Sequence, residues 1–207
     1  MNKPSKKLLT IFVIVSVILL GIILKVAFKP AGNMKTEIGS RVKGRSDAPV
    51  KIVEFADFQC PACANGAKII KELVKQYPDS IRLEMKYYPL TIIHKNTLLA
   101  TRYAECAARQ GEFWAYHDLL FERQKIWSDM LDPKDAFEQF AQEVKLAPSQ
   151  LKFCLEDKAI DALITKFKEE GNLMGVKSTP TYFVNGAMLV GSKTIQDEII
   201  KRIPLPK

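Results

Sequence analysis

Cysteine and histidine are scarce in this chain of 207 residues, which contains four cysteines and two histidines. No cysteine precedes Cys60, so we expect no lipid-modified cysteine near the N-terminus. Cys60 and Cys63 form one C-x-x-C pair, and neither a second such pair nor paired histidines follow it. Because a structural zinc ion needs four ligands of this kind, the sequence argues against a zinc site.

Excess charge is missing from most of the chain, although the formal net charge of the whole is +8. Residues 1–46 contain nine Lys and Arg against one Glu, whereas the 22 basic and 22 acidic residues of 47–207 cancel. A nucleic-acid-binding domain carries its basic excess on the folded part, so we expect no nucleic-acid partner. Internal repeats and low-complexity segments are also absent, which at this length predicts one domain with an appendage.

The N-terminal appendage is a long apolar segment. Residues 8–28 are almost entirely apolar and reach about the 20 residues that a membrane-spanning helix needs. The apolar core of a cleaved signal peptide would be shorter, and residues 25–30 make a poor cleavage site. We therefore expect an uncleaved single-pass anchor over residues 1–29 and a tether over residues 30–46.

Basic residues flank the apolar segment on both sides, so the distribution of charge does not decide its orientation. Large domains that follow such a segment are translocated largely regardless of charge. A C-x-x-C pair on a membrane tether is most useful on the oxidising side of the membrane. We therefore expect the domain on the extracytoplasmic side of a cell membrane, either periplasmic or at the cell surface.

The C-x-x-C pair lies where a predicted strand meets a predicted helix. Val50–Ala56 is short, β-branched and aromatic, as a buried strand is. After it, apolar residues recur at steps of three and four until Pro78, which predicts an amphipathic helix from Pro61 to Tyr77. Cys60 is then the N-cap residue, and the missing N–H of Pro61 at the first helical position costs nothing.

A cysteine at a helix N-terminus is chemically activated. The unpaired N–H groups and the positive end of the helix dipole favour a thiolate, which lowers the pKa of the cysteine. We therefore predict that Cys60 is the exposed, attacking thiol and that Cys63, one turn later, is its more buried partner. Half of a zinc site is the alternative interpretation of such a pair.

The rest of the chain alternates between strand and helix signals. Ile81–Tyr88 alternates apolar and polar residues and predicts a second strand, parallel to the first because a helix connects them. The turn Asn185–Gly186 between two apolar runs predicts a hairpin over 181–190, and a last helix is expected over 193–203. The predicted helices between the second strand and the hairpin run near 96–109, 111–126, 133–144 and 149–172.

This order of elements resembles the thioredoxin fold over roughly residues 45–203, and the helical insertion over about 94–173 resembles its DsbA-like branch. Members of that branch are thiol–disulfide oxidoreductases of the bacterial cell envelope. The fold class expected is therefore α/β, a thioredoxin fold over 47–207 with a helical insertion, preceded by one transmembrane helix. The segments similar to family patterns are Glu54–Cys63, Gln110–Asp118 and Thr179–Gly186.

The resemblance assigns further roles. It implies that the Thr179–Pro180 bond is cis and brings the Thr179 backbone against Cys60, where Pro61 and Ala62 also border the substrate. An extended substrate segment would pair with this backbone with little sequence selectivity. The resemblance also allows a structural disulfide between Cys106 and Cys154. Two separate buried thiols are the alternative for that pair.

Glu54 is a carboxylate in a largely apolar strand, six residues before Cys60. Thioredoxin-like proteins often bury an acid at this place, and such an acid could exchange a proton with Cys63. A partly solvated strand residue is the alternative. His94 and His117 are expected to be helix-start or helix-surface residues rather than members of the site.

These features together predict a membrane-tethered thiol–disulfide oxidoreductase that oxidises reduced exported polypeptides and is recycled by a quinone-linked membrane oxidase. No cofactor and no metal are expected beyond the redox-active Cys60–Cys63 pair. Some strongly oxidising relatives have His at the position of Ala62, which supplies no charge or donor, so we expect a weaker oxidant. The alternatives are a reductase of the same fold and a non-catalytic thiol-binding or metal-binding module.

Overall fold

The computed structural model describes residues 41–203. The predicted membrane anchor over residues 1–29 and the tether as far as residue 40 lie outside the described residues. Within the described part, no helix is both long enough and apolar enough to cross a membrane.

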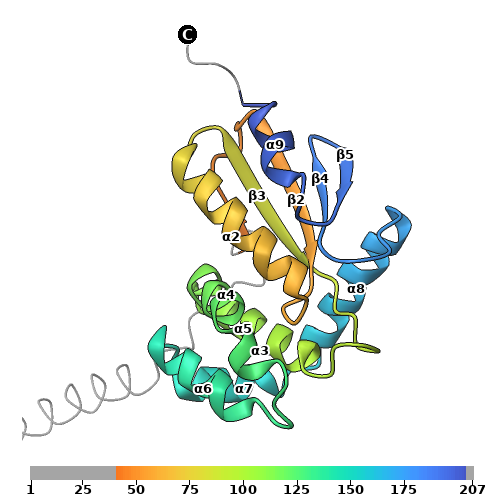
Figure 1. Cartoon of the computed structure of the whole chain (residues 1–207). Coiled ribbons are helices and arrows are strands. Elements are labelled where there is room, and N and C mark those ends of the chain that lie inside the picture. The colour runs from red at the N-terminus through yellow and green to blue at the C-terminus, as the bar shows by residue number, and fades with distance from the viewer. Residues whose placement is uncertain (1–40, 204–207) are drawn as a thin grey trace, which may run out of the picture. The chain divides into compact units, whose positions relative to one another are not determined.

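A five-stranded mixed sheet forms the centre of the domain (Figure 1). The strands lie in the order β1-β3-β2-β4-β5, and β2 pairs in parallel with β3 while the other pairs are antiparallel. This confirms the predicted parallel pair and the predicted hairpin. The strands are β1 (Val42–Lys43), β2 (Val50–Ala56), β3 (Ile81–Tyr87), β4 (Thr181–Val184) and β5 (Ala187–Val190).

Two helices cover one face of the sheet. Helix α2 (Pro61–Gln76) crosses from β2 to β3, close to its predicted bounds, and α9 (Ile195–Ile200) is shorter than the predicted 193–203. Both helices lie on the same side of the sheet in Figure 1. Their apolar residues pack on the inward residues of the strands and form the main core, which includes Ile52, Ile70, Leu73, Leu83, Ile195 and Ile199.

The other face of the sheet packs against α8 (Ala159–Leu173). Phe55, Tyr88 and Val176 form a second, smaller core there. Gly171 of α8 allows the close approach, since a side-chain carbon at that position would lie 2.9 Å from the Tyr88 ring. The two faces of β2 thus contact different helices, because successive side chains of a strand point to opposite faces.

The remaining helices gather at the end of the sheet where β2 leads into α2 (Figure 1). This confirms the predicted helical insertion between the second strand and the hairpin. Two predicted helices are each split in two, because the chain turns at Arg123 and at 156–158. The helices are α3 (Thr97–Arg109), α4 (Phe113–Glu122), α5 (Gln124–Trp127), α6 (Lys134–Glu143) and α7 (Pro148–Leu155).

Asp157 lies in the second break. Its carboxylate accepts a hydrogen bond from the backbone N–H of Ala159, the first residue of α8, at 2.9 Å. The same carboxylate accepts a hydrogen bond from Arg109 of α3 at 2.6 Å.

A disulfide joins Cys106 of α3 to Cys154 of α7, and both cysteines are buried. The predicted structural disulfide is therefore confirmed.

The predicted tether boundary at residue 46 is wrong, because the folded domain begins earlier. Arg41 is 1% exposed and donates to the Glu105 carboxylate of α3, which also accepts from the Tyr87 hydroxyl at 3.0 Å. Strand β1 then pairs with β3. A buried guanidinium is strongly unfavourable without such a partner, so this ion pair makes Arg41 part of the folded domain.

Gly66 of α2 provides a test of how this helix meets the sheet. A side-chain carbon at Gly66 would overlap the hydroxyl oxygen of Tyr182 in β4. Gly66→Ala, which in an open helix would stabilise by about 1 kcal/mol, should here lower the free energy of unfolding by about 1 to 3 kcal/mol. Urea unfolding measures the change.

Tyr182→Phe is the matched control, because it removes only the obstructing oxygen. The double variant Gly66→Ala with Tyr182→Phe should recover most of the lost stability. Equal unfolding midpoints for Gly66→Ala and the wild type would mean that Tyr182 does not lie against α2.

Candidate active site

The two cysteines of the C-x-x-C pair lie at the junction of β2 and α2. Cys60 is the N-cap residue and Pro61 the first residue of the helix, as predicted. Both cysteines are free thiols in this structure. Cys60 is 8% exposed and Cys63 is fully buried, so Cys60 is the more accessible sulfur but is more enclosed than predicted.

Four groups stabilise a thiolate on Cys60. The largest contribution comes from the Cys63 thiol, which donates a hydrogen bond to the Cys60 sulfur. The Thr179 side chain and the backbone N–H groups of Cys63 and Ala62 add to it, and together they overcome partial burial and lower the pKa of Cys60 to about 5. The backbone of Ala62 thus helps to stabilise the thiolate, although its side chain supplies no charge or donor.

The pKa of Cys63 is shifted in the opposite direction. Burial raises the pKa of the Cys63 thiol well above its usual range, and the neighbouring Cys60 raises it further. The backbone N–H of Asp57, 3.5 Å from the Cys63 sulfur, acts in the other direction. Near neutral pH the pair therefore contains one thiolate and one thiol, and each sulfur has a defined role in exchange chemistry.

The loop before β4 closes the site on the far side of Cys60. The Thr179–Pro180 peptide bond is cis, as the resemblance implied. The Cys60 sulfur lies 3.3 Å from the carbonyl oxygen of Thr179. Residues 119 positions apart are thus in contact at the reactive sulfur.

Glu54 lies in the centre of the sheet and is 1% exposed. Its strand has neighbours on both sides, with Met85 of β3 and Tyr182 of β4 as the paired residues. The alternative of a partly solvated strand residue is therefore wrong. Burial raises the pKa of Glu54 to about 8, and the nearby Tyr182 hydroxyl opposes part of this shift. At neutral pH Glu54 is mostly protonated beside the buried thiol.

Asp57 is a member of the site that the sequence analysis missed. Its buried carboxylate accepts hydrogen bonds from the backbone N–H groups of Gln59 and Leu90, each at 2.7 Å, and from the Thr97 hydroxyl. The His94 ring lies 2.8 Å from it, so His94 precedes α3 as predicted but contacts the site. The local sequence could indicate only that the Asp57 carboxylate accepts a hydrogen bond from the backbone N–H two residues later. That bond is common in turns and does not identify a functional site.

Gln124 of α5 is a second residue that the sequence analysis missed. Its side-chain amide donates to the backbone carbonyls of Phe58 at 2.8 Å and Cys60 at 3.0 Å. These bonds attach the C-x-x-C loop to the helical part, and no local pattern around residue 124 could have indicated them.

The prediction for His117 is wrong, because this residue is buried rather than at a helix surface. Its ring packs against Phe58, Trp114 and Phe121, and its Nδ1 lies 2.9 Å from the Asp118 carboxylate. The helix that carries it packs against α2, so the buried side of α4 faces the C-x-x-C helix.

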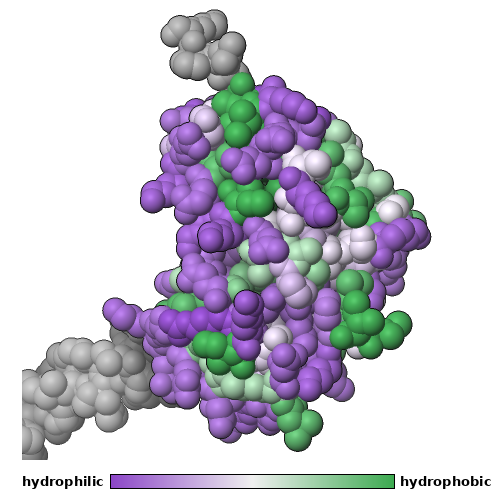
Figure 2. Space-filling model, in the orientation of Figure 1, coloured by the Kyte–Doolittle hydropathy of each residue, from purple (hydrophilic) through white to green (hydrophobic). Residues whose placement is uncertain are grey.

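The surface around the site is open and has both polar and apolar parts. A cavity of about 710 Å³ begins at Pro61 and runs between α2 and α4. Ile92 and Ile93, in the loop after β3, are 99% and 70% exposed. The face seen in Figure 2 is mostly hydrophilic with separate apolar patches. Within residues 41–203, no three His, Cys, Asp or Glu side chains gather where they could hold a metal ion.

The sequence of the chain is similar to those of known proteins. A family model described as thioredoxin matches residues 36–202. The chain is 36% identical over 155 residues to a Na⁺/H⁺ antiporter, NhaA 3, of Salinispora tropica, covering 75% of this chain and 23% of that protein. It thus spans about a quarter of the length of that antiporter. It is 27% identical over 194 residues to the probable disulfide bond formation protein D of Bacillus cereus, covering 88% and 90%.

Solved structures show the same fold. A thioredoxin-like oxidoreductase from Silicibacter pomeroyi has a TM-score of 0.64 at 25% identity, covering 78% of this chain and 90% of that one. The alpha-DsbA1 protein of Wolbachia pipientis has a TM-score of 0.68 at 19% identity, covering 78% and 89%. Oxidised BdbD of Bacillus subtilis has a TM-score of 0.67 at 24% identity, covering 80% and 94%.

The raised pKa of Glu54 predicts a pH-dependent stability. The unfolded chain ionises this carboxyl near its ordinary pKa, whereas the folded protein holds the proton until about pH 8. Stability should therefore fall as pH rises from about 4.5 to 8, by roughly 3 kcal/mol at pH 7. Glu54→Gln keeps the shape and cannot ionise, so it should remove this decline.

Urea unfolding of the reduced wild type and of Glu54→Gln across pH 4 to 9 tests the prediction. The difference between the two proteins isolates Glu54 from the other titrating groups. A difference that stays constant over this range would contradict the raised pKa.

Proposed function

The chain belongs to the thioredoxin family, as its sequence predicted, and we propose that it is a DsbA-like thiol–disulfide oxidoreductase that introduces disulfides into exported proteins. The observation that carries the proposal is the Cys60–Cys63 pair at the start of α2, in which the Cys63 thiol and the backbone N–H groups of Ala62 and Cys63 stabilise a thiolate on Cys60. The name of the Bacillus cereus relative, which matches over most of both chains, supports it.

The proposed reaction begins with the disulfide form of the pair. A substrate thiolate attacks the Cys60 sulfur, the Cys60–Cys63 bond breaks, and its electron pair leaves on the Cys63 sulfur. Glu54 gives its proton to that sulfur. A second substrate thiolate then attacks the substrate sulfur of the mixed disulfide, and Cys60 leaves as a thiolate. The substrate has lost two electrons and the pair has gained them.

The electrostatics of the site favour this direction. The better the reduced thiolate is stabilised, the more readily the disulfide form accepts electrons, and Cys60 has a pKa of about 5. An ionised Glu54 would oppose this by destabilising nearby thiolates, but the carboxyl is mostly protonated at neutral pH. The reductase alternative would need a less stabilised thiolate. We therefore favour net oxidation over reduction.

Substrate binding is proposed at the backbone beside the cis peptide bond. An extended segment of a client protein would lie along Thr179 and Pro180 and past Pro61 and Ala62, held mainly through main-chain contacts. The open cavity that begins at Pro61 leaves room for side chains of different sizes. Such a site accepts many reduced polypeptides.

The cellular setting is part of the proposal. The apolar segment within residues 8–28 would anchor the protein in a cell membrane with the domain outside the cytoplasm. A quinone-linked membrane oxidase would then reoxidise the reduced pair after each turnover. Both inferences rest on the sequence and on the chemistry that the pair requires.

The roles of the two sulfurs predict which variant traps a substrate. Cys63→Ala leaves Cys60 able to form a mixed disulfide but removes the thiol that resolves it within the protein. Incubated with a reduced, unfolded client protein and oxidised glutathione, this variant should accumulate covalent adducts that a reductant releases. Non-reducing electrophoresis and mass spectrometry detect them.

Cys60→Ala is the matched control and should give almost no adducts, because burial keeps Cys63 protonated. Adducts on Cys60→Ala at the level of Cys63→Ala would reverse the assignment. Failure of the wild type to oxidise the client would contradict the proposed function itself.

A further inference from the structure

A small, partly open cavity lies beside Glu54, on the face of β2 that α2 covers. Its volume is about 30 Å³, and its polar lining residues come from four different elements. They are Lys43 of β1, Glu54 of β2, Lys71 of α2, and Trp114, His117 and Asp118 of α4.

Two of the lining side chains contain buried polar atoms without a hydrogen-bond partner. These atoms are Oε1 of Glu54 and Nε2 of His117. Buried polar atoms in native proteins almost always have a partner, and ordered water commonly provides it. A cavity of more than about 15 Å³ with two or more polar partners can hold a water molecule. The cavity beside Glu54 satisfies both conditions.

The other nitrogen of His117 connects this cavity to the surface. Nδ1 lies 2.9 Å from the Asp118 carboxylate, which also pairs with Lys71 at 2.8 Å. Burial lowers the pKa of His117 and favours the neutral ring. A neutral ring that donates from Nδ1 to Asp118 presents a lone pair at Nε2. The Asp118 side chain is 21% exposed and so reaches solvent.

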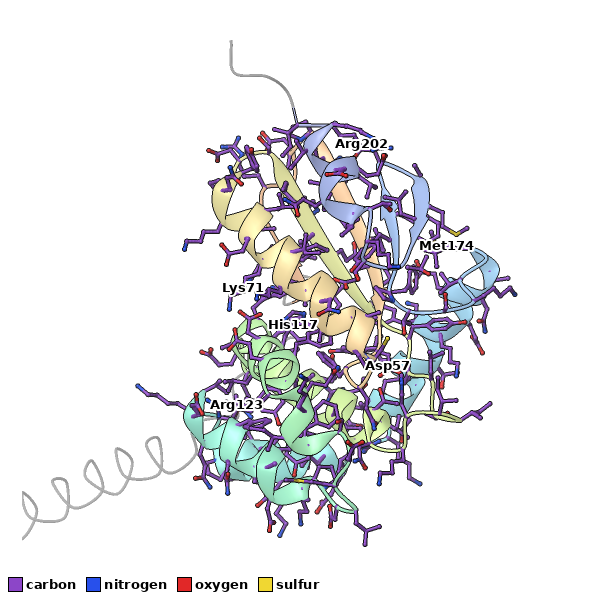
Figure 3. The ribbon with its side chains drawn as sticks, viewed as in Figure 1. Asp57, Lys71, His117, Arg123, Met174 and Arg202 are labelled. Carbon is purple, nitrogen blue, oxygen red and sulfur yellow. A yellow bond between two sulfur atoms is a disulfide. The ribbon has the colours of Figure 1, made fainter. Side chains whose placement is uncertain are left out.

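Figure 3 places His117 and Lys71 where α2 and α4 face each other. Lys43, Lys71, His117 and Asp118 are the charged or titratable groups that line the cavity with Glu54, and Tyr182 of β4 is paired with Glu54 in the sheet. His117 therefore lies between a buried acid and a partly exposed one.

We propose that a water molecule in this cavity joins Glu54 to His117, and that His117 and Asp118 form the path by which Glu54 exchanges its proton with solvent. The proposal rests on the proposed function, because it concerns the proton that Glu54 gives to Cys63 and takes back. His117 and Asp118 are positioning residues, since they act on the cysteines only through Glu54.

The path conserves protons at each step. The Glu54 carboxyl gives its proton to the water, and the water gives one to Nε2 of His117. The Nδ1 proton then passes to Asp118 and from there to solvent. Proton transfer in the reverse direction restores the His117 tautomer that is protonated at Nδ1. Glu54 is left as a carboxylate, which can take the proton of the Cys63 thiol. The Cys63 thiolate can then attack a mixed disulfide on Cys60.

The test measures that last step. The protein is prepared with glutathione on Cys60, and the release of glutathione by Cys63 is followed by rapid acid quench and mass spectrometry from pH 5 to 9. Glu54→Gln should slow release about 100-fold at pH 7. His117→Phe, which suits the aromatic surroundings, should slow it roughly tenfold and shift its pH profile.

Three controls separate proton transfer from packing. His117→Gln should recover part of the rate, because an amide can still bind the water. Asp118→Asn should resemble His117→Phe. Tyr103→Phe removes another buried, unpartnered hydroxyl, on α3 and outside the cavity lining, and should leave the rate and its pH profile unchanged.

The outcomes are distinguishable. If Glu54→Gln slows release but His117→Phe matches the wild type at every pH, the path is wrong and the proposed function stands. If Glu54→Gln has no effect, both the path and the role of Glu54 fail, while trapping by Cys63→Ala still tests the oxidoreductase.

A structural measurement covers the case in which His117→Phe does not fold. A high-resolution crystal structure of the wild type should contain a water within hydrogen-bond distance of both Glu54 Oε1 and His117 Nε2. Clear density for the two side chains without such a water would overturn the proposal.

Discussion

The stabilisation of a thiolate on Cys60 is the interaction on which the rest of the site depends. It requires the sulfur to lie at the N-terminus of α2, where the Cys63 thiol and two backbone N–H groups converge on it. Strand β2 and helix α2 set that position, and hydrogen bonds through Asp57 and Gln124 hold the connecting loop. The fold therefore supplies a preorganised environment for a negative charge, which a free cysteine in water lacks.

The same arrangement separates the chemistry of the two sulfurs by burial. Cys63 and Glu54 lie in the interior, where a charge is unfavourable, and both hold their protons at neutral pH. A buried carboxyl reduces stability as the pH rises, so packing alone does not account for Glu54 in the central strand. Its position beside the buried thiol, with a small polar cavity behind it, fits a group that carries protons.

Local patterns were sufficient to predict much of this molecule. The strand and helix around Cys60 and the hairpin follow from hydrophobic periodicity and turn residues, and the cis bond before Pro180 followed from the family resemblance. Contacts between distant segments were not predictable in this way. Arg41 pairs with Glu105, which is 64 positions away, so the folded domain includes residues that the sequence had assigned to the tether. The burial of His117 depends on how α4 packs against α2.

The reduction potential of the Cys60–Cys63 pair tests the central claim most directly. It is measured by equilibrating the purified domain with mixtures of reduced and oxidised glutathione and quantifying the two free thiols. A well-stabilised Cys60 thiolate predicts a potential of about −180 mV or higher. A value near that of thioredoxin, about −270 mV, would contradict net oxidation and identify the protein as a reductant.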